Sequence, residues 1–149
     1  MDAGVTVKKI LAPIDRSKYK EKIIAYAISL GKAWGAEITA IHVIDPGRGI
    51  PGGRIKEKEL EREEAARRPA EELLNEVDLQ AKKESINIKK EVVEVSDAVG
   101  KAIIEYALKN NIDVIVIGTT GMSAIQKIFL GSVANKVIHD AHCTVIAVR

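Results

Sequence analysis

Aromatic residues and cysteine are both scarce in this sequence of 149 residues. Only 3% of the residues are aromatic, so a core must be built from Val, Ile, Leu and Ala side chains. The single cysteine, Cys143, excludes an intramolecular disulfide and offers no metal-binding spacing. Because Cys143 begins the apolar run CTVIAV, we expect it to be a small buried thiol.

An excess of charge of one sign is also missing. The formal net charge is +2, and acidic and basic residues are interspersed along the chain. No basic stripe stands out that would neutralise a phosphate backbone, and no aromatic residues interleave with basic ones for base stacking. The sequence therefore does not suggest nucleic-acid binding.

Long apolar runs are absent as well. The first residues, MDAGVTVKK, lack the apolar segment of a secretory leader, and no run reaches the length that spans a membrane. A chain of this length is typical of one domain with a sizeable core. We expect one soluble domain over residues 1–149, located in the cytoplasm and making no membrane contact.

Two kinds of segment alternate along the chain. Short runs rich in β-branched residues are typical of buried strands and cover residues 7–15, 37–45, 87–95, 112–118 and 143–148. Apolar residues at helical spacing fill the intervals, after Ser17, over 56–84, after Asp97 and from Ser132.

The helix boundaries carry their own signals. Ser17 and Asp97 are expected to cap the helices that follow them. Gly35 and the pair Asn110-Asn111 are placed to end helices. Pro69 is expected to kink the long charged helix or to divide it into two pieces.

The alternation of strands and helices predicts an α/β fold with a parallel sheet and helices on both faces. Right-handed crossovers place the loops that leave the strands along one edge of the sheet. Ligands bind at that edge, where the winding direction reverses. Asp15 and Gly118 both stand at the carboxyl ends of predicted strands, so we expect both at this edge.

The segment GTTGMSAIQKIFLGSV, residues 118–133, has features of an anion site. Glycines after a strand let the backbone approach a ligand closely. A helix that begins at Gly131-Ser132 directs free N–H groups and the positive end of its dipole toward that ligand. Asp15 could accept hydrogen bonds from ribose hydroxyls or hold a cation near phosphates. From composition alone, a phosphate cradle and an ordinary glycine-rich turn are equally open.

Two other nucleotide motifs do not fit. Gly31-Lys32 and Gly100-Lys101 are each followed by Ala, whereas a Walker A motif needs Ser or Thr. GRGIPG, residues 47–52, matches G-x-G-x-x-G, but Pro51 and the charged stretch after it fit a loop better than a dinucleotide-binding turn.

Four motifs, taken in order along the chain, resemble the universal stress protein family. The pattern G-x2-G-x9-G-[ST] of its ATP-binding branch is matched by Gly118, Gly121, Gly131 and Ser132. ILAPIDRS, IHVID and the closing TVIAV also look like the corresponding strands of that family. The resemblance implies an open five-stranded sheet of order 3-2-1-4-5, Rossmann-like and similar to the adenine nucleotide alpha hydrolases. It places ATP between strands one and four.

The resemblance also implies a set of binding residues. Those at the adenosine end would be Pro13, Ile14, Asp15 and Val43. The ribose and phosphate path would be lined by Ile117, Gly118 and Gly121. The phosphates would be held by Gly131, Ser132 and Val133. The cofactor would be ATP or another adenine nucleotide, with Mg²⁺ or Mn²⁺ held mainly by the phosphates. Homodimers are expected to form through the last strand, Thr144 to Val148.

Three positions depart from the family pattern. Ala134 stands where some ATP-binding members have a hydroxyl residue, so one phosphate hydrogen bond is absent. Thr120 occupies a position that is often His or Arg, which removes a charged contact. Ser96-Asp97 replaces a turn that often contains Gly and Pro.

The resulting hypothesis is an ATP-binding regulatory module of the stress response, with little or no ATPase activity and an unidentified protein partner. No catalytic residue can be assigned, because the three histidines, His42, His139 and His142, show no catalytic or metal-binding spacing. Two alternatives stay open. One is a nucleotidyl-transferring or ATP-hydrolysing enzyme of the same fold group, and the other is a nucleotide-free dimeric scaffold.

Overall fold

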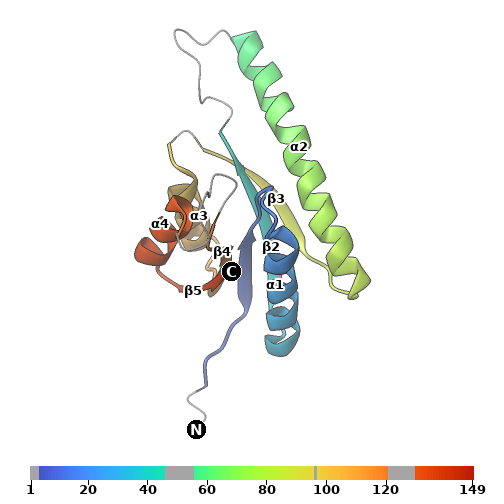
Figure 1. Cartoon of the computed structure of the whole chain (residues 1–149), viewed down its shortest axis with the longest axis vertical. Coiled ribbons are helices and arrows are strands. Elements are labelled where there is room, and N and C mark those ends of the chain that lie inside the picture. The colour runs from blue at the N-terminus through green and yellow to red at the C-terminus, as the bar shows by residue number, and fades with distance from the viewer. Residues whose placement is uncertain (1–3, 46–55, 96, 121–129) are drawn as a thin grey trace.

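The computed structural model describes residues 4–45, 56–95, 97–120 and 130–149. Within these residues five strands alternate with four helices, and Figure 1 shows the sheet between two layers of helices. The strands are β1 Lys9–Pro13, β2 Glu37–Ile44, β3 Lys89–Glu94, β4 Val114–Gly118 and β5 Thr144–Val148. The helices are α1 Lys20–Trp34, α2 Lys56–Lys83, α3 Val99–Lys109 and α4 Ser132–Asp140.

The sheet confirms the predicted fold class. All its strands are parallel, and their order is β3-β2-β1-β4-β5. The helices α1 and α2 lie on one face, and α3 and α4 lie on the other (Figure 1). The winding direction therefore reverses at β1, whose neighbours are β2 and β4.

Each face of the sheet has its own apolar core. Under α1 and α2, the completely buried side chains include Ile10, Ile24 and Val77. Under α3 and α4 they include Leu11, Ile115 and Val137. The residues of β1 alternate between the two clusters, because successive side chains of a strand point to opposite faces. Apart from Lys9, the strands β1 and β4 are thus without polar side chains, as a sheet covered on both faces requires.

The residues predicted to end helices are confirmed, whereas the residues predicted to cap their N-termini are not. Gly35 ends α1 in the left-handed conformation, with φ 64°, and Asn110 ends α3 ahead of Asn111, whose φ is 54°. The two predicted N-caps are wrong. Ser17 Oγ accepts a hydrogen bond from the N–H of Tyr19 in the turn ahead of α1, so the N-cap is Tyr19. Asp97 pairs with Lys101 instead, and the N-cap of α3 is Ala98.

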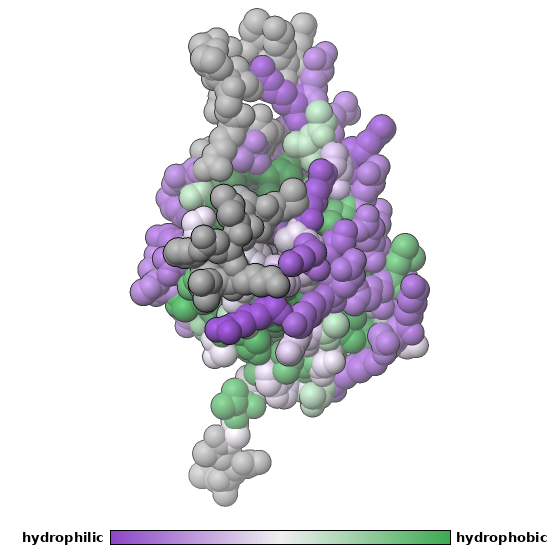
Figure 2. Space-filling view, viewed as in Figure 1, coloured by the Kyte–Doolittle hydropathy of each residue, from purple (hydrophilic) through white to green (hydrophobic). Residues whose placement is uncertain are grey.

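Helix α2 continues through Pro69 as one helix, so the alternative of two separate pieces is wrong. Its buried residues begin at Ala70 and recur on one face as Leu73, Leu74, Val77 and Ala81. That apolar stripe packs against β2 and β3. Its burial holds the second half of the helix in place even though Pro69 interrupts the backbone hydrogen bonds. The outer surface over α2 is dominated by hydrophilic residues (Figure 2).

Cys143 is partly buried rather than fully buried. It packs against the apolar cluster under α3 and α4, and burial raises the pKa of its thiol. None of the helices in the described residues is long and apolar enough to cross a membrane.

Candidate functional site

The ends of β1 and β4 separate at the carboxyl edge of the sheet. The two strands pair only at Ile10 with Val114 and at Leu11 with Ile115, although β1 continues to Pro13 and β4 to Gly118. Both strands keep their other neighbours beyond this point, since Pro13 pairs with Ile41 and Gly118 pairs with Val148. The sheet therefore opens where its winding direction reverses, which is where ligands bind in folds of this kind.

Asp15 stands on the β1 side of this opening. Its Oδ1 accepts a hydrogen bond of 2.9 Å from the N–H of Ser17, which forms a tight turn directly after the strand. The carboxylate is only partly buried, and its second oxygen makes no hydrogen bond within the described residues. Asp15 therefore has one oxygen committed to the turn and one available to a ligand.

The residue before Asp15 is held to β2 through both of its backbone groups. The N–H of Ile14 donates to the carbonyl of Ile41 at 2.7 Å. The carbonyl of Ile14 lies 2.6 Å from Nδ1 of His42. Ile14 itself is buried, with 3% of its surface exposed. Asp15 thus leaves the sheet from a fixed point.

On the β4 side, Thr119 joins three elements through its backbone. Its N–H donates to the carbonyl of Val148 at the end of β5, at 2.9 Å. Its carbonyl accepts a hydrogen bond of 2.6 Å from the N–H of Gly131, the N-cap of α4. The start of α4 is therefore tied to the end of β4 and, through Thr119, to the end of β5.

The first turn of α4 supplies the N–H groups of the predicted anion site. The first hydrogen bond of the helix runs from the N–H of Asn135 to the carbonyl of Gly131. The preceding N–H groups, those of Ser132, Val133 and Ala134, have no acceptor among the described residues. The N–H of Gly131 is already donated to Thr119, so a ligand would meet the three groups that follow it.

Gly118 ends β4 at a crowded point. A Cβ added there would lie 3.1 Å from Cδ1 of Ile23 and 3.6 Å from the carbonyl of Thr120. Contacts of 3.1 Å are tighter than most real Cβ contacts, so Ile23 would have to move. A glycine keeps the strand end close to α1 and leaves the backbone bare.

The structure brings most of the predicted site residues to one edge of the sheet. Pro13, Ile14 and Asp15 end the β1 segment, Val43 lies near the end of β2, and Ile117 and Gly118 end β4. Gly131, Ser132 and Val133 begin α4. Gly121 lies outside the described residues.

His42 is the neighbour of this site that sequence reasoning placed in a strand and gave no role. It lies in β2, and its ring contacts a carbonyl 28 residues earlier in the chain. The motif IHVID gives a weak signal, since a polar ring inside an apolar strand needs a hydrogen-bonding partner.

The polar groups described at this opening are the carboxylate of Asp15 and the N–H groups at the start of α4. No group of three or more His, Cys, Asp or Glu side chains that could hold a metal ion occurs within the described residues. A divalent cation would thus depend on ligand oxygens, with the free oxygen of Asp15 as the protein's contribution. The carboxylates with clearly lowered pKa values are each held by a lysine or arginine, and none is a predicted site residue; they are Glu37, Asp78, Glu94 and Asp140.

Known proteins of one family resemble this chain over almost its whole length. The family model described as "Universal stress protein family" matches residues 6–149. A universal stress protein of Methanocaldococcus jannaschii is 38% identical over 146 residues, which cover 95% of this chain and 82% of that protein. Universal stress protein A homolog 1 of Coxiella burnetii is 33% identical and covers 95% of both chains.

Solved structures show the same fold. The universal stress protein UspA of Lactobacillus plantarum superposes with a TM-score of 0.85 at 24% identity, covering 98% of this chain and 100% of that one. An Archaeoglobus fulgidus universal stress protein in complex with dAMP has a TM-score of 0.69 at 23% identity and covers 97% and 100% of the two chains. The family match covers almost every residue and includes both ends of the site, so this chain belongs to the universal stress protein family.

Proposed function

We propose that this protein binds an adenine nucleotide at the carboxyl edge of its sheet, between the ends of β1 and β4. The observation that carries the proposal is the parting of these two strands after Leu11 and Ile115, with Asp15 on one side and the start of α4 on the other. A carboxylate that accepts from ribose hydroxyls then faces N–H groups that bind phosphate.

The family relatives support the nucleotide class. The Archaeoglobus fulgidus protein was solved with dAMP, and another universal stress protein of the same fold was solved with cAMP, at a TM-score of 0.72 and 20% identity. For this chain we propose ATP, with Mg²⁺ or Mn²⁺ held mainly by its phosphates. The N–H groups of Ser132 and Val133 and the Ser132 hydroxyl would bind the phosphates, and Pro13, Ile14 and Val43 would contact the adenosine end.

The physiological role that we propose is regulatory. The nucleotide state would be read by a protein partner in the stress response, with little or no hydrolysis. The cytoplasmic location expected from the sequence remains a prediction. The role of Gly121 in lining the ribose and phosphate path also remains a prediction.

Titration of the purified protein with ATP and Mg²⁺ in a calorimeter tests nucleotide binding directly. We expect saturable binding, and absence of binding at millimolar ATP contradicts the proposal. Gly118→Val should abolish binding, because its branched side chain would clash with Ile23 and displace the end of β4 that borders the opening. Glu84→Ala, at an exposed position just after the end of α2, is the matched control and should bind as the wild type does.

Two further measurements separate the alternatives. Release of phosphate or pyrophosphate at a rate well above that of free ATP would favour an enzyme over a regulatory module. An empty site in the protein as purified, together with no binding in the titration, would favour the nucleotide-free scaffold.

We also propose that the protein is a homodimer through β5. This strand forms one edge of the sheet, and its sequence TVIAV has no charge to discourage pairing with another strand. In α4, the helix that precedes this strand and contacts it, Ile138 is 41% exposed. A second copy paired along β5 would satisfy the open backbone groups of the edge and cover apolar surface.

A further inference from the structure

We propose that His42 is a positioning residue that fixes Asp15 for nucleotide binding, an inference that rests on the proposed function. Its ring is the side chain that meets the backbone of the chain just before Asp15, with Nδ1 at 2.6 Å from the Ile14 carbonyl. This contact lies at the point where the chain leaves the sheet.

The contact replaces a sheet hydrogen bond that β1 no longer makes. The ladder between β1 and β2 ends at the pair Pro13 and Ile41, and one more N–H, that of Ile14, still donates to Ile41. Beyond this residue the chain turns away, so the carbonyl of Ile14 has to find a donor outside the ladder. The His42 side chain supplies that donor from the next residue of β2.

The chemistry of the pair fixes the state of the ring. A backbone carbonyl can only accept a hydrogen bond, so Nδ1 of His42 must carry the proton. In the neutral ring Nε2 then has no proton and can act only as an acceptor. The structure therefore assigns the Nδ1–H tautomer to His42.

The link from His42 to Asp15 is short and rigid. Ile14 is held by β2 on one side of Asp15, and Ser17 is held by the carboxylate of Asp15 itself on the other, at 2.9 Å. With the backbone fixed at Ile14 and one carboxylate oxygen fixed by Ser17, the second oxygen of Asp15 has little freedom to move. Without the His42 donor, the buried Ile14 carbonyl would seek another partner and the turn that carries Asp15 would shift.

Two variants of His42 test the proposal as a matched pair. In His42→Asn the amide nitrogen stands at the same place along the side chain as Nδ1 and can donate the same hydrogen bond. His42→Leu has similar bulk and no donor. We expect His42→Leu to raise the dissociation constant for ATP about tenfold, and His42→Asn to regain most of the wild-type affinity.

Measurements of folding and of ATP affinity distinguish a loss of positioning from a loss of structure. Circular dichroism and thermal melting first establish that both variants fold. If His42→Leu binds ATP as tightly as the wild type, or if folded His42→Asn binds as weakly as His42→Leu, the positioning role is wrong. If the wild type itself binds no adenine nucleotide, the proposed function fails, and the positioning role fails with it.

A spectroscopic test of the contact needs no nucleotide. The nitrogen chemical shifts of the His42 ring, measured by NMR on ¹⁵N-labelled wild-type protein, report which nitrogen carries the proton. We expect the Nδ1–H tautomer, and an Nε2–H tautomer in the neutral ring overturns the inference.

Discussion

The two edge strands of the sheet, β3 and β5, deal with their open backbone edges in opposite ways. The sequence of β3, KKEVVE, has four charged residues among six, whereas β5, TVIAV, has none. Both strands are parallel members of the same sheet and each has one neighbour. The difference therefore lies in the side chains and in the helices beside them.

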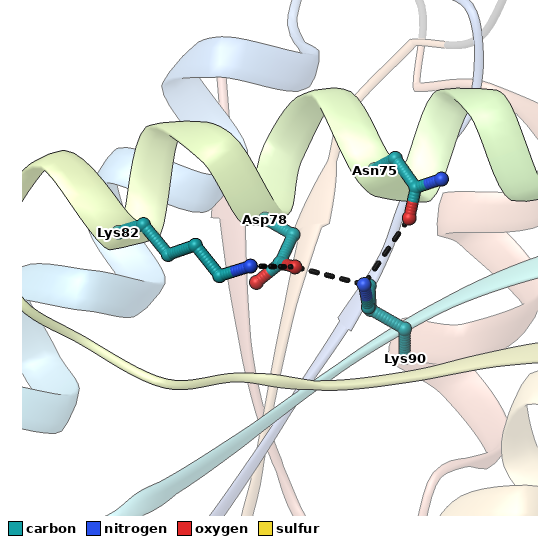
Figure 3. Close-up of polar contacts among 4 residues, drawn as sticks. All are labelled: Asn75, Asp78, Lys82 and Lys90. Atoms are coloured by element: carbon teal, nitrogen blue, oxygen red, sulfur yellow. Dashed lines mark hydrogen bonds and ion pairs between the residues drawn. The ribbon is translucent and has the colours of Figure 1, made fainter.

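Every charged residue of β3 is engaged by a neighbouring element. Lys90 donates to Asp78 at 2.8 Å and to Asn75 at 3.1 Å, and Lys82 pairs with the same carboxylate at 3.3 Å (Figure 3). The remaining partners are Glu37 for Lys89, Tyr106 for Glu91 and Arg67 for Glu94. A second copy approaching this edge would meet charges that already have partners, and would have to dehydrate them.

The β5 edge, in contrast, presents no charged side chains. Thr144 and Ala147 are exposed, and α4, which contacts β5, exposes the apolar side chain of Ile138. This difference agrees with the proposed dimer, in which a second copy would pair with the uncharged edge and be disfavoured at the charged one. Four sets of substitutions at these edges and in the contacts beside them test this contrast.

The largest effect should come from a proline on the open side of β5. Val148 accepts its hydrogen bond from Thr119 and so faces β4, which means that the N–H of Ala147 faces outward. Ala147→Pro removes this donor and, by symmetry, the same donor in the second copy. We expect the dissociation constant of the dimer to rise at least about 30-fold, measured by analytical ultracentrifugation.

The matched control is a proline on the outward side of β3. Val95 donates to Ile44 and faces β2, so the N–H of Val92 faces outward. Val92→Pro should leave the dimer intact. If it dissociates the dimer while Ala147→Pro does not, the assignment of the interface to β5 is wrong.

The next effect should come from Asp78, the centre of the cluster in Figure 3. Its side chain is only 9% exposed and neutralises two lysines. Asp78→Ala should lower the free energy of unfolding by about 2 kcal/mol, since Lys90, one-third exposed, can partly recover water. Denaturant unfolding measures this loss of unfolding free energy. Glu84→Ala, which breaks an exposed pair with Lys32, is the control and should cost less than about 0.5 kcal/mol.

The sequence predicts the elements of this sheet well because each strand and helix has a local signal. The apolar runs place all five strands, although their ends are shorter than predicted, as in β1, where the ladder stops at Pro13. The failed N-caps show the limit of local signals. The hydroxyl of Ser17 and the carboxylate of Asp97 each had a competing partner nearby, Tyr19 and Lys101, which the pattern alone cannot rank.

The candidate site shows a different limit. Asp15 and Gly118 could be placed at one edge from the rule for parallel sheets, and the strand order came from the family resemblance rather than from periodicity. The contacts of His42 with Ile14 and of Gly131 with Thr119 could not be predicted. Both join residues that are distant in sequence, and both use a backbone carbonyl, which every residue has.

A smaller effect should appear in the response to acid. The hydrogen bond from Lys90, with that from Lys82, lowers the pKa of Asp78 below its ordinary value of 3.8, against the opposing effect of burial. A lowered pKa in the folded protein adds stability that is fully present above that ordinary value and is lost as pH falls through the folded-state pKa. Between about pH 5 and pH 2, Asp78→Asn should lose less stability than the wild type does. Equal slopes of unfolding free energy against pH would contradict this.

The smallest effect should come from Arg67 and Glu94, whose pair at 2.8 Å joins α2 to the end of β3. The two side chains are 43% and 34% exposed, so water screens the pair far more than it screens Asp78. A double-mutant cycle with Arg67→Ala and Glu94→Ala should give a coupling energy of about 0.5 kcal/mol or less. A coupling as large as the loss in Asp78→Ala would mean that β3 is held along its length and not mainly at Lys90. The protection of this edge would then depend on the whole row of charges, and removing any one of them would weaken the contrast with β5.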